Sequence, residues 1–298
     1  MIRKTVFLVF YGWLTTTALL AQNGVLVFQS DFGTKDGAVS AMKGVAVGVS
    51  PNLRIFDLTH EIPPYNIWEA AYRLLQTAPY YPKGTVFVSV CDPGVGTERK
   101  SVVLLTQSGH YFVTPDNGTL TLIAEKLGIR QVREIDEAVN RLRNSSESYT
   151  FHGRDVYAYT GARLAAKMIT FAQVGRELPA EVTKLPYQRP VLEKGVLKGN
   201  IPVLDVQYGN LWTSIPKQLF GQLGTKTGET VRVRIYHQDQ LVFDNRLPLV
   251  NTFGESKAGE NVAYFNSLLN FSVAVNMGNF AEKYNVNSGP DWRVEVEK

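Results

Sequence analysis

Val90-Cys91-Asp92-Pro93-Gly94-Val95-Gly96-Thr97-Glu98-Arg99 ends an apolar run that begins at Thr85. Buried strands of open α/β sheets have such runs, and ligands bind beyond the carboxyl ends of these strands. The stretch therefore predicts a strand that leads into a loop with an acid and a base. A second unit, Phe151-His152-Gly153-Arg154-Asp155, supplies one of the four histidines. Asp92, Arg99 and His152 together could bind and orient one water molecule.

Strand and helix patterns alternate on both sides of this stretch, which is typical of a mostly parallel sheet covered by helices. We therefore expect an α/β, Rossmann-like domain over residues 22–180. Its predicted strands are 25–29, 53–58, 85–90, 101–106 and 110–114, and its predicted helices are 38–49, 68–77, 118–127 and 154–168.

A polar, proline-bearing segment at 177–190 is typical of an interdomain linker. The short apolar runs that follow it predict a smaller, antiparallel β domain over residues 191–298. Its predicted strands are 199–206, 230–237, 240–243, 261–266 and 271–276.

Residues 1–21 are interpreted as a targeting segment. Arg3 and Lys4 precede an uncharged, largely apolar run, and Ala21 is a small residue suited to cleavage before Gln22. We therefore predict a secretory signal peptide. The mature protein would be secreted or periplasmic, without stable membrane insertion. An uncleaved membrane anchor is the alternative.

Composition excludes several function classes. The formal charge of +4 falls by two if Arg3 and Lys4 are removed, and the sequence has no dense stripe of lysine and arginine. Charge therefore gives no support to nucleic-acid binding. Cys91 is the single cysteine, which rules out an internal disulfide framework and sites with several thiolates. It is expected to be a buried structural thiol. No pair of histidines has metal-ligand spacing, so neither a metal nor a cofactor is predicted.

Each candidate residue also has a structural interpretation. Asp31 could bind a ribose diol or cap the next helix. Asp92 could form an Asx turn, and His152 could be a half-buried histidine with satisfied hydrogen bonds. The segment around Tyr208 and Asn210 suits a flat heteroaromatic ligand, but also an ordinary turn in a β domain.

Several motifs, taken in order, resemble those of one family. They are Ser30-Asp31-Phe32-Gly33, Asp57-Leu58-Thr59-His60-Glu61-Ile62, Asp92-Pro93-Gly94-Val95-Gly96-Thr97, Pro115-Asp116-Asn117-Gly118, Phe151-His152-Gly153-Arg154-Asp155, Tyr208-Gly209-Asn210 and Val273-Ala274-Val275-Asn276. The chain resembles the S-adenosyl-L-methionine hydrolases, or hydroxide adenosyltransferases, which are related to fluorinase and chlorinase. The resemblance implies that water attacks the ribose 5′ carbon and that adenosine and L-methionine are released.

The resemblance also implies roles for individual residues. Asp92, Arg99 and His152 would hold the attacking water. Sites would form between the subunits of a homotrimer, from the first domain of one subunit and the second domain of its neighbour. The implied substrate-binding residues are Asp31 on the ribose, Tyr65 along the ribose and adenine, Tyr208, Asn210 and Phe253 at the adenine, and Asp36, Asp205 and Ser267 at the methionine.

Some positions depart from the family pattern. Tyr208 replaces a usual phenylalanine, and Leu268, Leu269 and Asn270 replace a more polar stretch. Gly153 and Val95 stand where the fluorinase has hydroxyl side chains. A chloride-using halogenase is therefore the alternative enzyme, with the carboxylate of Asp92 disfavouring an anion. A non-catalytic periplasmic adenosine-binding protein is the alternative from another class.

Overall fold

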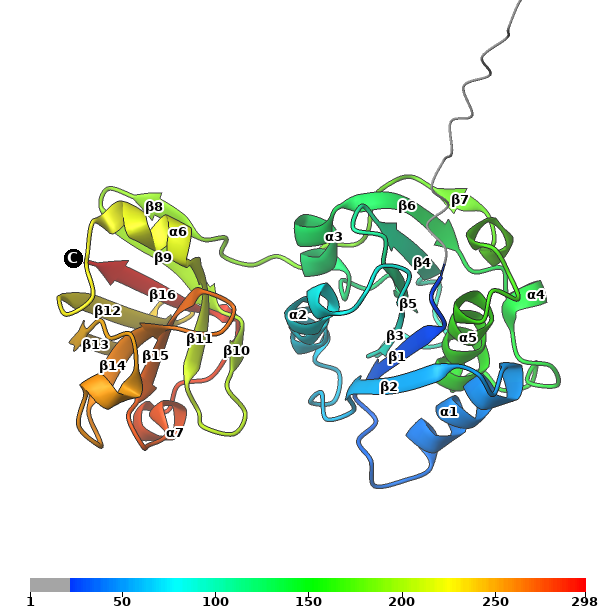
Figure 1. The fold of residues 1–298 in the computed structure, drawn as a ribbon, viewed down its shortest axis with the longest axis horizontal. Helices are drawn as coiled ribbons and strands as arrows, with labels where there is room; N and C mark the ends of the chain where they lie inside the picture. The colour runs from blue at the N-terminus through cyan, green and yellow to red at the C-terminus, as the bar shows by residue number, and fades with distance from the viewer. Residues whose placement is uncertain (1–21) are drawn as a thin grey trace, which may run out of the picture.

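The computed structural model describes residues 22–298, which form an α/β domain and a β domain joined by an extended segment (Figure 1). The predicted signal peptide lies outside the described residues. The first domain is built on a seven-stranded sheet with the order β2-β1-β3-β5-β4-β6-β7. Its strands are β1 (Val25–Ser30), β2 (Arg54–Thr59), β3 (Val86–Val90), β4 (Ser101–Thr106), β5 (Tyr111–Pro115), β6 (Ile129–Glu134) and β7 (Glu177–Leu178).

Half of this sheet is parallel, which confirms the predicted α/β class. β1 pairs in parallel with β2 and β3, and β3 pairs in parallel with β5. β4, β6 and β7 continue the sheet in antiparallel fashion. β4 and β5, both predicted strands, form an antiparallel hairpin, whereas β6 lies outside the predicted strands and β7 lies in the predicted linker. The linker proper therefore begins after Leu178.

Helices cover both faces of the sheet (Figure 1). One apolar core joins β1 and β3 to α1 (Ala38–Val49), the π-helix η2 (Gly153–Ala158) and α5 (Tyr159–Ala165). The other joins the opposite face to α2 (Ile67–Thr77) and α3 (Thr121–Leu127). The remaining helical segments are α4 (Glu137–Asn140) and the 3-10 turns η1 (Ala78–Tyr80) and η3 (Phe171–Val174).

The second domain is antiparallel throughout its named strands, as predicted. One sheet has the order β13-β12-β16-β9-β8 and the other the order β10-β11-β15-β14. The strands are β8 (Val191–Glu193), β9 (Val196–Ile201), β10 (Val203–Leu204), β11 (Leu211–Pro216), β12 (Thr230–His237), β13 (Gln240–Pro248), β14 (Asn261–Phe265), β15 (Asn270–Val275) and β16 (Gly289–Glu297). The helical segments are α6 (Lys217–Phe220), α7 (Phe280–Tyr284), η4 (Gly221–Leu223) and η5 (Phe253–Glu255).

The two domains contact each other along α2. Trp68 Nε1 donates to the carbonyl of Pro202 at 3.0 Å, and Arg73 donates to the carbonyl of Leu204 at 3.3 Å. Leu122 and Leu268 pack in the same small apolar cluster as Trp68. This contact positions the β domain beside the helices rather than over the ends of the parallel strands.

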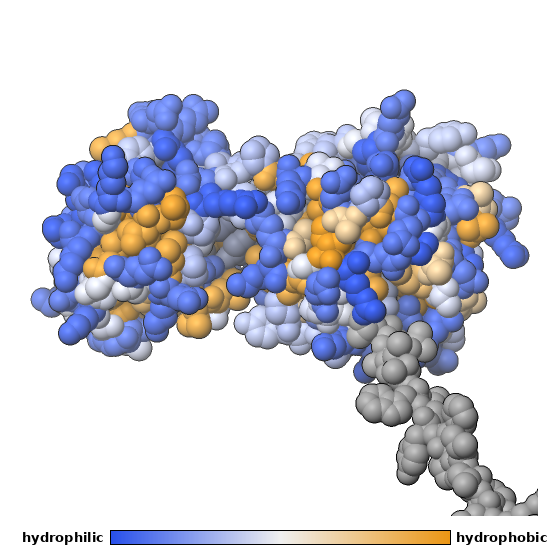
Figure 2. All heavy atoms as spheres, turned by 90° about the horizontal axis from the view of Figure 1, so that it is seen from above, coloured by the Kyte–Doolittle hydropathy of each residue, from blue (hydrophilic) through white to orange (hydrophobic). Residues whose placement is uncertain are grey.

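The surface seen from above is largely hydrophilic, with apolar residues gathered in a patch on each domain (Figure 2). Across residues 22–298, every helix is too short or too polar to cross a bilayer.

Candidate active site

The parallel strands bring two acidic loops together. β1 and β3 are neighbours in register, with Ser30 beside Val90, so both end at the same edge of the sheet. Asp31 follows the first strand, and its N–H donates to the carbonyl of Val90 at 3.3 Å. Asp92 follows the second strand after one residue. The sheet geometry therefore places both carboxylates at the edge where ligands bind in open α/β sheets.

The loop after β3 turns back so that Arg99 meets Asp92. Gly96 takes the left-handed φ of 78° that this tight loop requires. Arg99 Nε then lies 3.0 Å from Asp92 Oδ1, and its Nη2 lies 2.6 Å from Oδ2. The two side chains are only 12% and 5% exposed. This two-pronged, charge-assisted geometry fixes the orientation of the carboxylate.

His152 approaches this ion pair from the π-helical turn. Arg99 Nη2 lies 3.1 Å from its Nδ1, so one guanidinium bridges Asp92 and His152. Burial lowers the pKa of His152 below its ordinary value of 6.5 and Arg99 lowers it further, against the raising effect of Glu137. The three residues predicted to hold water therefore converge, with the imidazole in its neutral form at neutral pH.

A cavity of about 320 Å³ lies beside this group. Asp92 and His152 line it together with Asp31 and Tyr65, and the other lining residues are Phe32, Pro64, Val90, Val95, Thr150, Phe151 and Gly153. Tyr65 is 73% exposed and has a strained φ of 66°. Asp31 Oδ2 holds it by accepting its N–H at 2.9 Å. The helix-cap interpretation of Asp31 is wrong, because Gly37 is the N-cap residue of α1.

A second cavity, of about 530 Å³, lies on the β domain. Tyr208, Asn210 and Phe253, which the resemblance places at the adenine, line it together. Asp205 lies at the start of the turn that presents Tyr208 and Asn210, where its carbonyl accepts the N–H of Gly209 at 2.8 Å. The two cavities share no lining residue, and they lie on different domains.

Asp36 and Ser267, like Asp205, line neither of these two cavities. Asp36 lines neither cavity, and its Oδ1 accepts the N–H of Ala38 at 2.9 Å at the beginning of α1. Ser267 lines a third cavity, of about 540 Å³, between α2, α3 and the β domain. The chain as a monomer therefore joins neither side chain to the cavity of Asp92.

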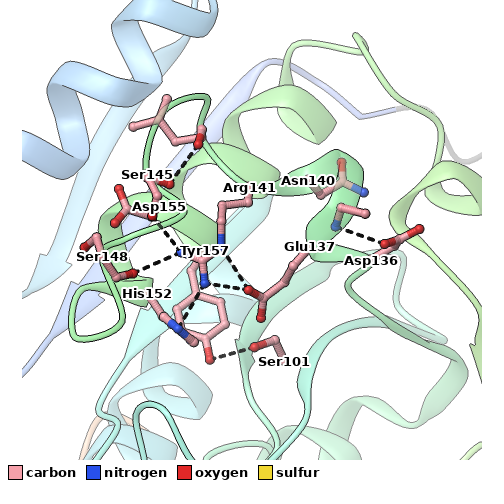
Figure 3. A network of polar contacts seen from close by, with 12 residues as sticks. Ser101, Asp136, Glu137, Asn140, Arg141, Ser145, Ser148, His152, Asp155 and Tyr157 are labelled. Carbon is pink, nitrogen blue, oxygen red and sulfur yellow. Dashed lines mark hydrogen bonds and ion pairs between the residues drawn. The ribbon is translucent and has the colours of Figure 1, made fainter.

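A further group of residues behind His152 has no counterpart in the predictions. Figure 3 shows Arg141 between Glu137 and His152, with Tyr157 and Ser101 on the other side. Tyr157 OH lies 3.1 Å from Ser101 Oγ and 3.5 Å from Asp92 Oδ2. Glu137 and Arg141 are four residues apart, a spacing that in sequence indicates only an ordinary helix-surface ion pair.

Cys91 is fully buried, as expected of a structural thiol. Burial and the neighbouring charge of Asp31 raise its pKa far above the ordinary range for a thiol. A thiol held in its protonated form is a poor nucleophile. The thiol of Cys91 is therefore not a nucleophile of this site.

The sequence matches the profile of the SAM hydroxide adenosyltransferase N-terminal domain over residues 26–175 and that of the C-terminal domain over residues 199–293. The chain belongs to this family. It is 36% identical to the (R)-S-adenosyl-L-methionine hydrolase of Methanocaldococcus jannaschii, over 92% of this chain and 95% of that protein. It is also 29% identical to a fluorinase of an Actinoplanes species, over 90% of this chain and 96% of that protein.

The fold of this family member is also similar to that of solved structures. A crystal structure of a conserved protein from Thermotoga maritima superposes with a TM-score of 0.84 at 33% identity, over 92% of this chain and all of that one. The likeness extends over both domains, so the arrangement of strand ends described above is shared with a solved structure.

Proposed function

We propose that this protein hydrolyses S-adenosyl-L-methionine to adenosine and L-methionine by attack of water on the ribose 5′ carbon. The observation that carries the proposal is that Asp92 and His152 line one cavity and that Arg99 bridges them. Membership of the family and likeness to relatives named as (R)-S-adenosyl-L-methionine hydrolases supply the substrate.

The chemistry suits these side chains. The sulfonium leaves as a neutral thioether, so no acid has to protonate the leaving group. Water is a weak nucleophile, and catalysis then depends on holding it in line behind the carbon. The carboxylate of Asp92 offers an acceptor for a hydrogen of the water, while Arg99 fixes that carboxylate and, through Nδ1, the ring of His152 beside it. Asp31 and Asp92 also favour a cationic substrate over a halide.

We further propose that the working form is a homotrimer in which the β domain of one subunit completes the cavity of the next. The candidate adenine residues line a cavity that shares nothing with the cavity of Asp92, although both would bind parts of one small molecule. The N-terminal segment would direct the chain out of the cytoplasm, and we expect it to be cleaved after Ala21 during export.

The activity is tested by incubating purified protein with each sulfonium epimer of S-adenosyl-L-methionine and following adenosine by chromatography. Adenosine and methionine in equal amounts, from the (R) epimer named in the relatives, are expected. Absence of adenosine from both epimers would overturn the proposal. Tight adenosine binding without turnover, measured by calorimetry, would select the non-catalytic alternative.

The same assay in chloride or fluoride distinguishes the halogenase alternative. The relatives include fluorinases, so 5′-halogenated adenosine is a specific alternative product. A side chain at Gly153 would meet the ring of Phe32 at 3.1 Å and Val90 at 3.2 Å. The hydroxyl side chain that the fluorinase has at this position therefore does not fit without a shift of these neighbours. We expect adenosine as the product at every halide concentration.

The shared site is tested by complementation. Asp92→Ala disables the α/β half and Asn210→Ala weakens the β half, so each homotrimer should be inactive or weakly active. Co-expressed subunits would form some sites with both halves intact, and activity should return. Activity that stays at the mean of the two variants would contradict the subunit-shared site, and light scattering reports the oligomer independently.

Export is tested by fractionating cells that express the full chain and determining the mature N-terminus by mass spectrometry. A product that begins at Gln22 in the periplasm or medium is expected. A full-length cytoplasmic chain would contradict this part of the proposal.

A further inference from the structure

The ring of His152 lies between two guanidinium groups. Arg99 Nη2 lies 3.1 Å from Nδ1, and Arg141 Nη2 lies 3.1 Å from Nε2. A guanidinium only donates hydrogen bonds, and a neutral imidazole has one nitrogen that accepts and one that donates. The neutral ring can therefore satisfy one of the two arginines, whereas a doubly protonated ring would satisfy neither.

Arg141 is held in place by contacts on its other sides. Glu137 Oε2 accepts from Nη2 at 2.6 Å and from Nε at 3.1 Å. Nη1 donates to the carbonyls of Ser148 at 3.2 Å and Ser145 at 3.4 Å, within the loop that leads to His152 (Figure 3). The Arg141 side chain is only 16% exposed. Its head group is thus fixed, with one remaining direction that points to the imidazole.

We propose that Arg141, anchored by Glu137, is a positioning residue for the hydrolysis: it sets the orientation of the His152 ring and keeps that ring neutral. The inference rests on the proposed hydrolysis of S-adenosyl-L-methionine. It gives the ion pair of Glu137 and Arg141 a part in the reaction, in addition to the three residues proposed to hold the water.

Charged groups face His152 from several elements. Asp92 and Arg99 come from the loop after β3, Glu137 from α4 and Arg141 from the segment after it, and the Tyr157 ring lies 6.5 Å away at an edge-on angle. After burial, the carboxylate of Glu137 has the largest effect on the pKa of His152 and raises it, whereas Arg99 and Arg141 lower it. The two partners of one ion pair therefore act on the ring in opposite directions.

Because Glu137 and Arg141 act on the pKa of His152 in opposite directions, variants of the two residues should shift it in opposite directions. A purely structural role would not produce this result. Arg141→Met removes a positive charge and leaves Glu137 uncompensated, so the acidic limb of kcat/KM against pH should move up by about one unit. Glu137→Gln leaves Arg141 uncompensated, and the limb should move down by a similar amount. Arg141→Lys keeps the charge but loses the planar fork, so the limb should return toward its parental position while the plateau rate stays lower.

Glu69 and Arg73 on α2 provide a matched control. They have the same spacing of four residues, an arginine of comparable burial, a separation of 2.9 Å and a further bond from the arginine to a backbone carbonyl. Arg73→Met and Glu69→Gln should leave the acidic limb at its parental pH. Melting curves of all variants show whether each one is folded.

The pKa of His152 is also measured without turnover, from the pH dependence of its ring proton signals in NMR, assigned with His152→Asn. Opposite shifts in Arg141→Met and Glu137→Gln support the proposal even if adenosine formation fails, so the two proposals fail separately. Unchanged titration in both variants, or shifts of the same sign, would overturn the role of this ion pair.

Discussion

Nη2 of Arg99 lies 3.1 Å from Nδ1 of His152, so a permanently cationic donor faces this ring nitrogen. A proton on Nδ1 would point at the guanidinium, and the contact is satisfied only while that nitrogen accepts. The same guanidinium holds Asp92 at 2.6 Å. One guanidinium therefore binds the carboxylate of Asp92 and favours the neutral form of the His152 ring.

The first prediction concerns the pH dependence of turnover. Because burial and Arg99 lower the pKa of His152, the ring stays neutral until the pH falls below 6.5, and activity should decline only there. The acidic limb of kcat/KM measures this value. His152→Asn should have low activity without the limb. A limb above pH 6.5 that disappears in His152→Asn would contradict the assignment.

The second prediction concerns the ion pair itself. Asp92→Asn retains the shape but leaves Arg99 without its partner, and adenosine formation should fall by about 100-fold or more. Since the pair is largely buried, the same change should cost about 3 kcal/mol of unfolding free energy. Chemical denaturation measures this value. Asp244→Asn, at the exposed pair with Arg232, is the control and should change stability little.

The third prediction concerns the turn that presents Asn210. Gly209 has a φ of 65°, and a Cβ there would meet Asn279 Oδ1 at 1.8 Å, so Gly209→Ala should lower both stability and affinity for adenosine. Gly224 has a φ of 67° with nothing within 4 Å of a Cβ. Gly224→Ala should therefore show only the left-handed strain, about 1 kcal/mol. Equal melting temperatures for the two variants would contradict the clash.

The fourth prediction concerns the thiol. Cys91 is buried and its pKa is raised by burial and by Asp31, so iodoacetamide at pH 8 should leave both the thiol and the activity of the folded protein unchanged. Mass spectrometry after alkylation measures the labelled fraction, and the unfolded chain, which should label fully, is the control. Rapid labelling with loss of activity would show that the strand end opens in solution.

The sequence predicts those parts of the site that depend on regular structure. The apolar runs before Asp31 and Asp92 identify strand ends, and parallel pairing then brings the two acids together. His152 is far away in the chain; its chemistry suggests a role shared with Asp92 and Arg99, and the family resemblance implies that role. Nothing local indicates that Tyr65 takes a left-handed backbone, because that conformation is imposed by Asp31 from another loop.

Tertiary context decides the remainder. The spacing of Glu137 and Arg141 is that of any exposed helix pair, and their contact with His152 depends on how the following loop folds back. The resemblance implies a methionine contact for Ser267, but the turn that carries it packs toward α2 in the described chain. The helical pattern at 154–168 predicts a helix, but it cannot separate the wide turn at Gly153–Ala158 from the α-helix that follows it.

That wide turn has a consequence for how this part of the chain tolerates change. A π-turn holds one more residue than an α-turn, and each residue of an α-helix rotates the chain by about 100°. Deleting one residue between Gly153 and Ala158 would leave α5 seated in the core while swinging the imidazole around the helix axis, away from Asp92. The extra residue therefore sets the rotation of His152 relative to α5. A change of length in this segment is expected to leave the domain folded while moving His152 away from Asp92.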